Sequence, residues 1–121
     1  MIHILSVDDE PIHQFVIKEF LSNSYELSFV DSGENCLKHL CLVKPDIILM
    51  DICLPGINGL ETSKKIRNTF GYDKTPIIFL STLEYSACQQ NIQQVNGYYI
   101  SKPFNKELLV KLINKVSQIK K

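Results

Sequence analysis

Short apolar runs that alternate with amphipathic stretches constrain the fold of this chain more than any other feature. Two of these runs, Ile47–Met50 and Ile77–Leu80, consist of apolar residues only. Strands that are covered on both faces of a sheet have this character, because neither face meets water. Five strands are expected in all, over Ile2–Val7, Glu26–Val30, Asp46–Met50, Pro76–Leu80 and Tyr98–Ser101.

The segments between these runs carry apolar residues at helical spacing. Pro11 suits the first turn of the first helix, and Ser32 and Asn105 are residue types that cap helices. Five strands that alternate with five helices indicate an α/β fold, in which a parallel sheet has helices on both faces. The positions that define the inward faces of the five expected helices are Ile12, Phe15, Val16 and Phe20; Leu37, Leu40 and Cys41; Leu60, Ser63, Ile66 and Phe70; Tyr85, Cys88, Ile92 and Val95; and Leu108, Leu109, Leu112, Ile113 and Val116.

The composition suits one globular domain that binds neither nucleic acid nor a membrane. The chain has 121 residues, and its 13 Lys and Arg balance its 13 Asp and Glu. A chain without net charge lacks the field that recruits polyanions. No apolar run is long enough to span a membrane, and the N-terminus has no signal-peptide pattern, so we expect a cytoplasmic protein. The four cysteines lack the spacing of a zinc site and are predicted to be free thiols.

Polar residues follow the predicted strands where a parallel sheet places its ligands, at the carboxyl ends. Like charges in "VDDEP" repel one another, and a hard divalent cation, with Mg²⁺ as the first choice, suits such crowded carboxylates. A hydroxyl and an amine nearby suit phosphoryl oxygens. The residues at this edge are Asp8, Asp9 and Glu10 after the first strand, Asp51 after the third, Ser81 and Thr82 after the fourth, and Lys102 after the fifth.

Four segments together carry a resemblance to a known family: "VDDEP", "DIILMDICLPGINGLE", "PIIFLS" and "YYISKPF". In this order and spacing the chain resembles the receiver domain of response regulators in two-component signalling, and in particular the single-domain chemotaxis regulators. The resemblance implies a flavodoxin-like (βα)5 fold, a three-layer sandwich whose five parallel strands follow the order 2-1-3-4-5. It also implies one receiver domain over residues 1–121.

The resemblance also implies a phosphoryl-transfer site. Asp51 would be the phosphoacceptor, whose carboxylate attacks phosphorus and forms an acyl phosphate. Mg²⁺ (or Mn²⁺) would be held by Asp9, by Asp8 directly or through water, by Asp51, and by the backbone carbonyl of Cys53. Gly59 matches the loop after the acceptor, where a side chain does not fit.

A switch is implied by the same resemblance. Lys102 would pair with the phosphoryl oxygens, and Ser81 would donate a hydrogen bond to one of them. Tyr99 would turn inward when Ser81 moves toward the phosphoryl group. The Lys102–Pro103 bond is expected to be cis. Thr82 departs from the family pattern, where Ala is common, and predicts slower hydrolysis of the acyl phosphate.

The partners implied are a histidine kinase or a histidine phosphotransfer protein as phosphoryl donor, and a downstream protein. The downstream protein would bind the face made by the fourth helix, the fifth strand and the fifth helix, unless phosphate is relayed onward. Because the chain ends at Lys121, directly after the last helix, we expect no output domain, although a receiver cut from a larger protein would have the same sequence. The chain would then be a switch rather than an enzyme, catalysing only its own phosphorylation and slow dephosphorylation.

Two other functions fit parts of the pattern. A phosphatase of haloacid-dehalogenase (HAD) type also uses a nucleophilic Asp after a strand, but it needs a second Asp two residues later, where this chain has Cys53. A receiver-like interaction module that phosphorylation does not regulate would not need the complete set of polar residues Asp8, Asp9, Asp51, Ser81 and Lys102. The histidines lie away from the predicted strand ends, and we interpret them as surface or packing residues: His3, His13 and His39.

Overall fold

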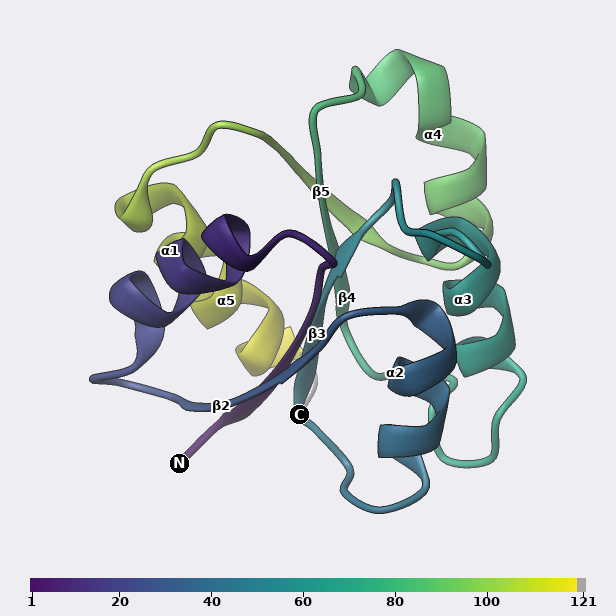
Figure 1. Ribbon diagram of the computed structural model, residues 1–121, viewed down its shortest axis with the longest axis horizontal. Coiled ribbons are helices and arrows are strands. Elements are labelled where there is room, and N and C mark those ends of the chain that lie inside the picture. Colours follow the sequence, from purple (N-terminus) through teal and green to yellow (C-terminus); the bar gives the residue numbers. More distant parts are fainter. Residues whose placement is uncertain (120–121) are drawn as a thin grey trace.

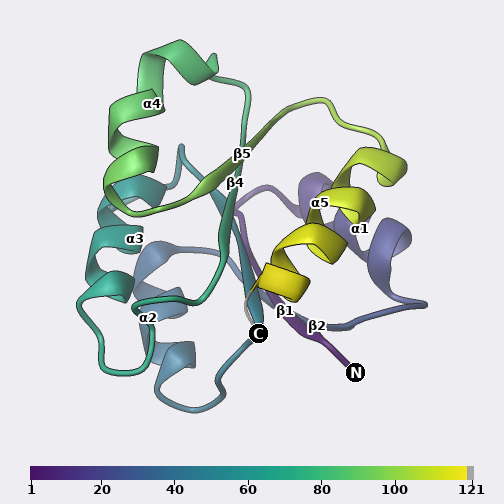
Figure 2. The same cartoon turned by 180° about the vertical axis from the view of Figure 1, so that it is seen from behind.

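Helices cover both faces of a parallel sheet in the computed structural model, which describes residues 1–119 (Figure 1). The sheet has the strand order β2-β1-β3-β4-β5, and every pair of neighbours is parallel. Helices α1 and α5 lie on one face, and α2, α3 and α4 lie on the other (Figures 1 and 2). The predicted flavodoxin-like fold is therefore confirmed. In chain order the elements are β1 (His3–Val7), α1 (Pro11–Leu21), β2 (Glu26–Val30), α2 (Gly33–Leu40), β3 (Ile47–Asp51), α3 (Gly59–Arg67), β4 (Ile77–Ser81), α4 (Tyr85–Gln94), β5 (Tyr98–Ser101) and α5 (Lys106–Ile119).

The strands divide their apolar side chains between two cores. Along β3, Ile47 and Leu49 pack in the core that α1 and α5 cover, whereas Ile48 and Met50 pack in the core of α2, α3 and α4. Successive side chains of a strand point to opposite faces, so both faces of β3 must be apolar. All four residues are almost completely buried. This packing holds β3 firmly up to its last residue, Asp51.

Strands β3 and β4 each begin and end one residue later than the sequence predicted. Asp51 pairs with Leu80, and Ser81 pairs with Ser101, so both polar residues belong to the sheet. A sequence pattern ends where apolar character ends, but backbone pairing continues as long as a neighbouring strand is present. The two polar residues are thus held by strand geometry and not by a loop.

The apolar patterns of all five helices differ in part from the expectation. At or next to α2, α4 and α5, the residues Cys41, Tyr85 and Leu108 are exposed. On α1, Ile12 and Phe15 are 66% and 59% exposed, and Ile17 and Leu21 are buried in their place. Phe70 lies beyond the C-terminal end of α3 and is fully exposed. A helix with apolar residues on more than one side can turn any of these sides toward the sheet. Only the packing against the sheet decides which side is buried.

Two predicted helix caps and the start of α1 are confirmed. The hydroxyl of Ser32 accepts a hydrogen bond from the backbone N–H of Asn35 at 3.0 Å. The side-chain oxygen of Asn105 accepts one from the N–H of Leu108 at 2.7 Å. Pro11 is the first residue of α1. Each cap contributes about 1 kcal/mol, because it satisfies a backbone donor that has no partner within the helix.

Two further expectations from composition can be compared with the structure. All four cysteines are free thiols, with Cys36 and Cys88 buried and Cys41 and Cys53 exposed. Among the helices within residues 1–119, none combines the length and the hydropathy that crossing a bilayer requires.

Candidate functional site

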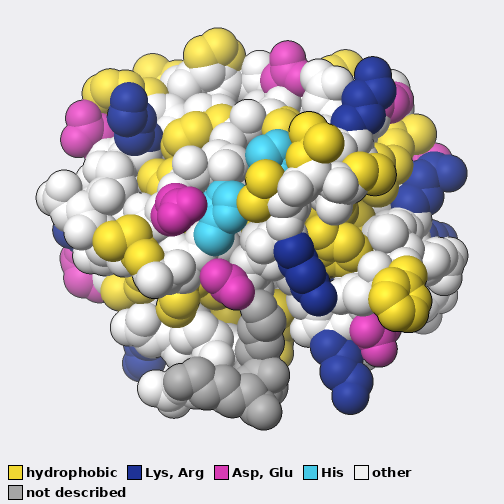
Figure 3. Space-filling view, turned by 90° about the horizontal axis from the view of Figure 1, so that it is seen from below, with side chains coloured by type: hydrophobic (Ala, Val, Ile, Leu, Met, Phe, Trp, Pro, Cys, Tyr) yellow, Lys and Arg dark blue, Asp and Glu magenta, His cyan; other side chains and the backbone are white. Residues whose placement is uncertain are grey.

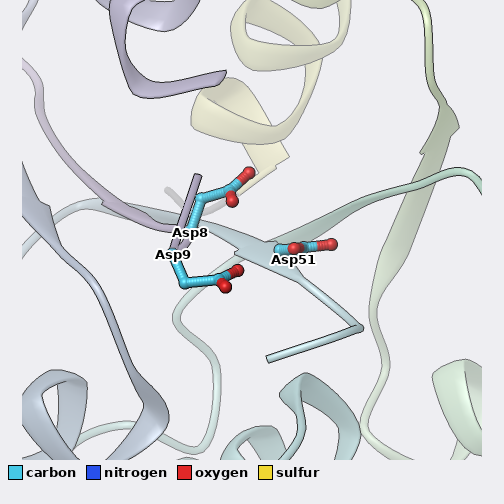
Figure 4. Close-up of side chains that lie close together, drawn as sticks. All are labelled: Asp8, Asp9 and Asp51. Atoms are coloured by element: carbon cyan, nitrogen blue, oxygen red, sulfur yellow. The ribbon is translucent and has the colours of Figure 1, made fainter. Parts of the chain in front are cut away.

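Three carboxylates meet at the edge of the sheet where β1 and β3 end (Figure 4). Asp8 and Asp9 directly follow β1, and Asp51 is the last residue of β3. The parallel register brings them together, because Val7 at the end of β1 pairs with Met50 of β3. One carboxylate oxygen from each aspartate lies within 4.8 Å of the others.

Two of the three aspartates are buried. Asp8 is 6% exposed and Asp51 is 8% exposed, whereas Asp9 is open to solvent. Asp8 is also fixed in direction: its Oδ1 accepts a hydrogen bond from the N–H of Glu10 at 2.9 Å, and its own N–H donates to the carbonyl of Val30 at 3.1 Å. The cluster therefore combines two rigid carboxylates with one that solvent reaches.

Burial raises the pKa of Asp51 above the ordinary value of an aspartate, since a charged carboxylate loses its hydration there. The charges of Asp8 and Asp9 raise this pKa further. Lys102 lowers it, as does a hydrogen bond from the backbone of Cys53, but the raising influences prevail. The ionised form of Asp51 is thus stabilised by any positive charge that enters the cluster.

Lys102 supplies the one positive charge that the structure records in contact with two of these aspartates. Its side chain is only 10% exposed, and its Nζ lies 3.0 Å from Asp8 Oδ2 and 3.7 Å from Asp51 Oδ1. The shorter contact is a hydrogen bond to Asp8, whereas the longer one is an ion pair. The backbone N–H of Lys102 donates to the carbonyl of Ser81 at 2.8 Å, and the Lys102–Pro103 bond is cis.

Ser81 and Tyr99 are connected through the backbone of Leu83. The buried hydroxyl of Ser81 accepts a hydrogen bond from the N–H of Leu83 at 3.0 Å. The half-buried Tyr99 donates its hydroxyl hydrogen to the carbonyl of the same residue. The Tyr99 ring also packs against Tyr85 of α4, with ring centroids 5.4 Å apart. A movement of Ser81 toward the site would therefore disturb the loop that holds Tyr99.

Gly59 allows the loop after Asp51 to fold back onto the strand. A Cβ atom at this position would lie 2.1 Å from the backbone oxygen of Asp51, which is far inside van der Waals contact. The N–H of Gly59 instead donates to the carbonyl of Ile52 at 2.8 Å. The side chain of Asn58 caps α3 by accepting from the N–H of Glu61. The close approach requires glycine for lack of space, not for an unusual backbone angle.

His13 lies at the site, although the sequence placed it away from the strand ends. Its Nδ1 is 2.9 Å from Asp8 Oδ2 and 3.0 Å from Lys102 Nζ. His13 belongs to the first turn of α1, and side chains of a helix lean toward its N-terminus. Because α1 begins directly after the acidic run, this lean carries the imidazole back to the carboxylates. His13 also falls on the same stripe as the buried Ile17 and Leu21, which is the signal that could have identified it.

Gln14 is a second residue that the sequence did not single out. Its side-chain nitrogen donates hydrogen bonds to the carbonyls of Ser6, Asp8 and Val30 at 3.0 to 3.2 Å. Its side-chain oxygen accepts from the hydroxyl of Ser6 at 2.6 Å. One amide therefore joins α1 to the ends of β1 and β2 and holds the backbone that carries Asp8.

The donor set fits Mg²⁺, because the three clustered side chains offer carboxylate oxygens and no sulfur or nitrogen ligand. Cys53 is exposed, and its carbonyl as a further ligand stays a prediction. A cavity of about 320 Å³ adjoins the cluster. It has an apolar interior between α1 and the segment after β5, and Asp51, Thr82 and Lys102 are among the residues that line it.

The opposite end of the strands has a different surface. Figure 3 shows acidic and basic side chains scattered among apolar and uncharged ones there. Among the described residues, Asp8, Asp9 and Asp51 form the single group of potential metal-binding side chains that gather this closely. The carboxyl ends of the strands are therefore the place where chemistry is concentrated.

Comparison with known proteins identifies the family to which the fold and the carboxylate cluster belong. The family model of the response regulator receiver domain matches residues 4–114. The chain is 34% identical to the sensory transduction protein LytT of Oceanobacillus iheyensis over 118 residues, which cover 95% of this chain and 48% of that protein. It covers 34% of another curated relative. The chain thus spans half or less of the length of these two relatives.

Solved structures give the same class. The chemotaxis protein CheY4 of Vibrio cholerae superimposes with a TM-score of 0.90 at 29% identity, over 96% of this chain and 98% of that one. The receiver domain of the sensor histidine kinase PA1611 of Pseudomonas aeruginosa PAO1 superimposes with a TM-score of 0.87 at 28% identity, over 96% and 97% of the two chains, and holds a magnesium ion in its active-site cleft. This chain belongs to the response regulator receiver domain family. Its acidic cluster is consistent with a Mg²⁺ site, and a phosphoacceptor role in signalling fits the fold and the site.

Proposed function

We propose that this protein receives a phosphoryl group on Asp51 from a histidine kinase or a histidine phosphotransfer protein, and that the phosphorylated form changes its binding of a downstream protein or passes the group on. Residues 1–121 would act as one receiver domain. The prediction of a cytoplasmic location goes with this proposal.

The observation that supports the proposal most directly is the pairing of a buried nucleophile with its electrostatic partners. One carboxylate oxygen of Asp51 lies within 4.8 Å of an oxygen of Asp8 and an oxygen of Asp9. Lys102 Nζ is 3.7 Å from Asp51 Oδ1. A carboxylate in these surroundings combines a nucleophilic oxygen with groups that can neutralise a transferred phosphoryl group.

The transfer step balances as a substitution at phosphorus. An oxygen of Asp51 forms the new P–O bond while the P–N bond of the donor phosphohistidine breaks. The electron pair of that bond stays on the imidazole nitrogen, which takes up a proton from solvent. Lys102 would then move from Asp8 to the phosphoryl oxygens, and Ser81 would donate its hydroxyl hydrogen to one of them.

Mg²⁺ (or Mn²⁺) would be held by Asp8, Asp9, Asp51 and the carbonyl of Cys53. When bound, such an ion offsets the negative charge of the carboxylates and of the phosphoryl group. Without this compensation, the like charges of the cluster oppose the approach of a phosphate. The raised pKa of Asp51, which burial causes first and its acidic neighbours next, agrees with this requirement.

The downstream protein is proposed to bind the face made by α4, β5 and α5. Tyr99 lies on β5 and shares the backbone of Leu83 with Ser81, so a shift of Ser81 toward the phosphoryl group would release or redirect the tyrosine. Phosphorylation would thereby select between two arrangements of one surface.

Neither alternative function has comparable support. An HAD-type phosphatase requires an acid two residues after the nucleophile, and the free thiol of Cys53 stands there. A module that phosphorylation does not regulate gives no reason for burying Asp8, Asp51 and Lys102 together. Burying charged groups costs hydration that their mutual attraction does not fully return.

The test is incubation with Mg²⁺ and acetyl phosphate, followed by intact-mass analysis of wild type and Asp51→Asn. We expect the wild type to gain one phosphoryl group and Asp51→Asn to gain none. Inorganic phosphate should be released only slowly, because each protein must lose its phosphoryl group by hydrolysis before it can be phosphorylated again. Rapid multiple turnover would favour the phosphatase, and no adduct in either protein would favour the unregulated module.

A further inference from the structure

His13, Lys102 and Asp8 form a triangle, and His13 lies outside the four segments that carry the family resemblance. His13 Nδ1 lies 2.9 Å from Asp8 Oδ2 and 3.0 Å from Lys102 Nζ, and that Nζ lies 3.0 Å from the same Asp8 oxygen. The other oxygen of Asp8 accepts a hydrogen bond from the N–H of Glu10. Two nitrogens thus crowd around one carboxylate oxygen and lie only 3.0 Å from each other.

The hydrogen-bonding capacities of the three groups cannot all be satisfied. An ammonium group only donates and a carboxylate only accepts, whereas Nδ1 of a histidine either donates or accepts. If Nδ1 carries a hydrogen, it donates to Asp8 but faces the hydrogens of Lys102. If Nδ1 is bare, it accepts from Lys102 but faces a lone pair of Asp8. In both tautomers one of the two short contacts of His13 is unfavourable.

Departure of Lys102 from Asp8 removes this conflict. His13 Nδ1–H can then donate to Asp8 Oδ2 at the distance already present. The buried carboxylate keeps a donor and does not become unsatisfied, which would otherwise be costly. Lys102 has a short way to go, because its Nζ is already 3.7 Å from Asp51 Oδ1.

We infer that His13 is a positioning residue, which crowds Lys102 at Asp8 and so favours the release of Lys102 toward the phosphoryl group on Asp51. This inference rests on the proposed function. The imidazole never touches the phosphoryl group; it acts through Asp8 and Lys102. The side chain of His13 is 38% exposed, so its ring hydrogens exchange with water and either tautomer is accessible.

Three variants separate this role from a structural one. His13→Leu keeps the bulk and removes the close contact of the two nitrogens, so Lys102 stays on Asp8, and we expect the rate of phosphorylation by acetyl phosphate at saturating Mg²⁺ to fall roughly tenfold. His13→Asn places an amide near the position of Nδ1 and should stay within about twofold of wild type. His3→Leu is the matched control, because His3 pairs with Ser28 at the other end of the sheet, and it should leave the rate unchanged.

A double-mutant cycle with Lys102→Met tests the route of action. If His13 acts by releasing Lys102, His13→Leu should have no further effect on the rate once Lys102 is absent. An undiminished tenfold loss in the Lys102→Met background overturns the inference. Circular dichroism of each variant verifies that it is folded.

A spectroscopic signature is independent of the rates. In the wild type with Mg²⁺ and beryllofluoride, a stable phosphoryl analogue, the ¹⁵N spectrum of the His13 ring should show a hydrogen on Nδ1. A bare Nδ1 in this state, or a His13→Leu rate equal to wild type, overturns the inference. A wild type that takes no phosphoryl group overturns the proposed function and this inference together, whereas a phosphorylated wild type no faster than His13→Leu overturns the inference alone.

Discussion

Replacing Asp51 by Asn should stabilise the folded protein, although it removes the residue on which the function depends. Coulomb's law at an effective dielectric constant of about 20 gives a repulsion of roughly 3.5 kcal/mol or more between buried carboxylates whose oxygens lie within 4.8 Å of each other. This is the interaction of Asp51 with Asp8. The exposed Asp9 is screened by water and adds about 1 kcal/mol.

The attraction of Lys102 offsets these repulsions. At 3.7 Å it amounts to roughly 4.5 kcal/mol on the same scale. The remaining cost to folding is the lost hydration of the Asp51 carboxylate, since this residue is only 8% exposed. We therefore expect Asp51→Asn to raise the free energy of unfolding by roughly 1–3 kcal/mol at neutral pH.

The pH dependence follows from the sign of the pKa shift. Burial raises the pKa of Asp51 in the folded state, so ionisation of this group opposes folding. The penalty is complete above the folded-state pKa and disappears below the ordinary aspartate pKa. The stability advantage of Asp51→Asn should therefore be largest at neutral pH and should shrink as the pH falls.

The assay is urea unfolding followed by circular dichroism, with EDTA present, at pH 7 and at successively lower pH. Asp31→Asn is the control, because Asp31 is exposed, and its effect should stay within about 0.5 kcal/mol. An Asp51→Asn protein that is no more stable than wild type at pH 7, or whose advantage grows on acidification, refutes the reasoning.

Three other substitutions test separate parts of the structure. Thr82→Ala should speed the loss of the phosphoryl group several-fold, since it opens the site to water; equal rates of phosphate release would remove the idea. Gly59→Ala should displace the backbone of Asp51 and lower both the stability, by roughly 1–3 kcal/mol, and the phosphorylation rate; unchanged thermal unfolding would contradict the close approach. Arg67→Ala should cost about 2–3 kcal/mol in urea unfolding, because the guanidinium donates to three backbone carbonyls between α3 and β5; a loss under 1 kcal/mol would contradict this.

The fold and the edge that carries the site could be predicted because they depend on continuous apolar runs and on the alternation of strands with helices. Continuous apolar runs indicated strands covered on both faces, and parallel strands place their carboxyl ends together. Asp8, Asp9, Asp51 and Lys102 meet at one edge for this reason alone. No knowledge of side-chain conformation was needed.

The residues that the sequence missed depend on the rotation of a helix about its axis. The apolar pattern of α1 predicts that Ile12 and Phe15 face the sheet, but both are exposed. Ile17 and Leu21 define the stripe of α1 that faces the sheet. His13 lies on this stripe, one turn before Ile17 and beside the carboxylates. The connection from Ser81 to Tyr99 through Leu83 is likewise a property of one loop conformation, which residue types do not encode.

The most direct test of the central claim is a crystal structure of the protein with Mn²⁺, located by its anomalous scattering. We predict an ion bound by oxygens of Asp9 and Asp51, with the carbonyl of Cys53 as a further ligand, beside a free oxygen of Asp51. An ion bound elsewhere, or no ion at the acidic edge at saturating Mn²⁺, would contradict it.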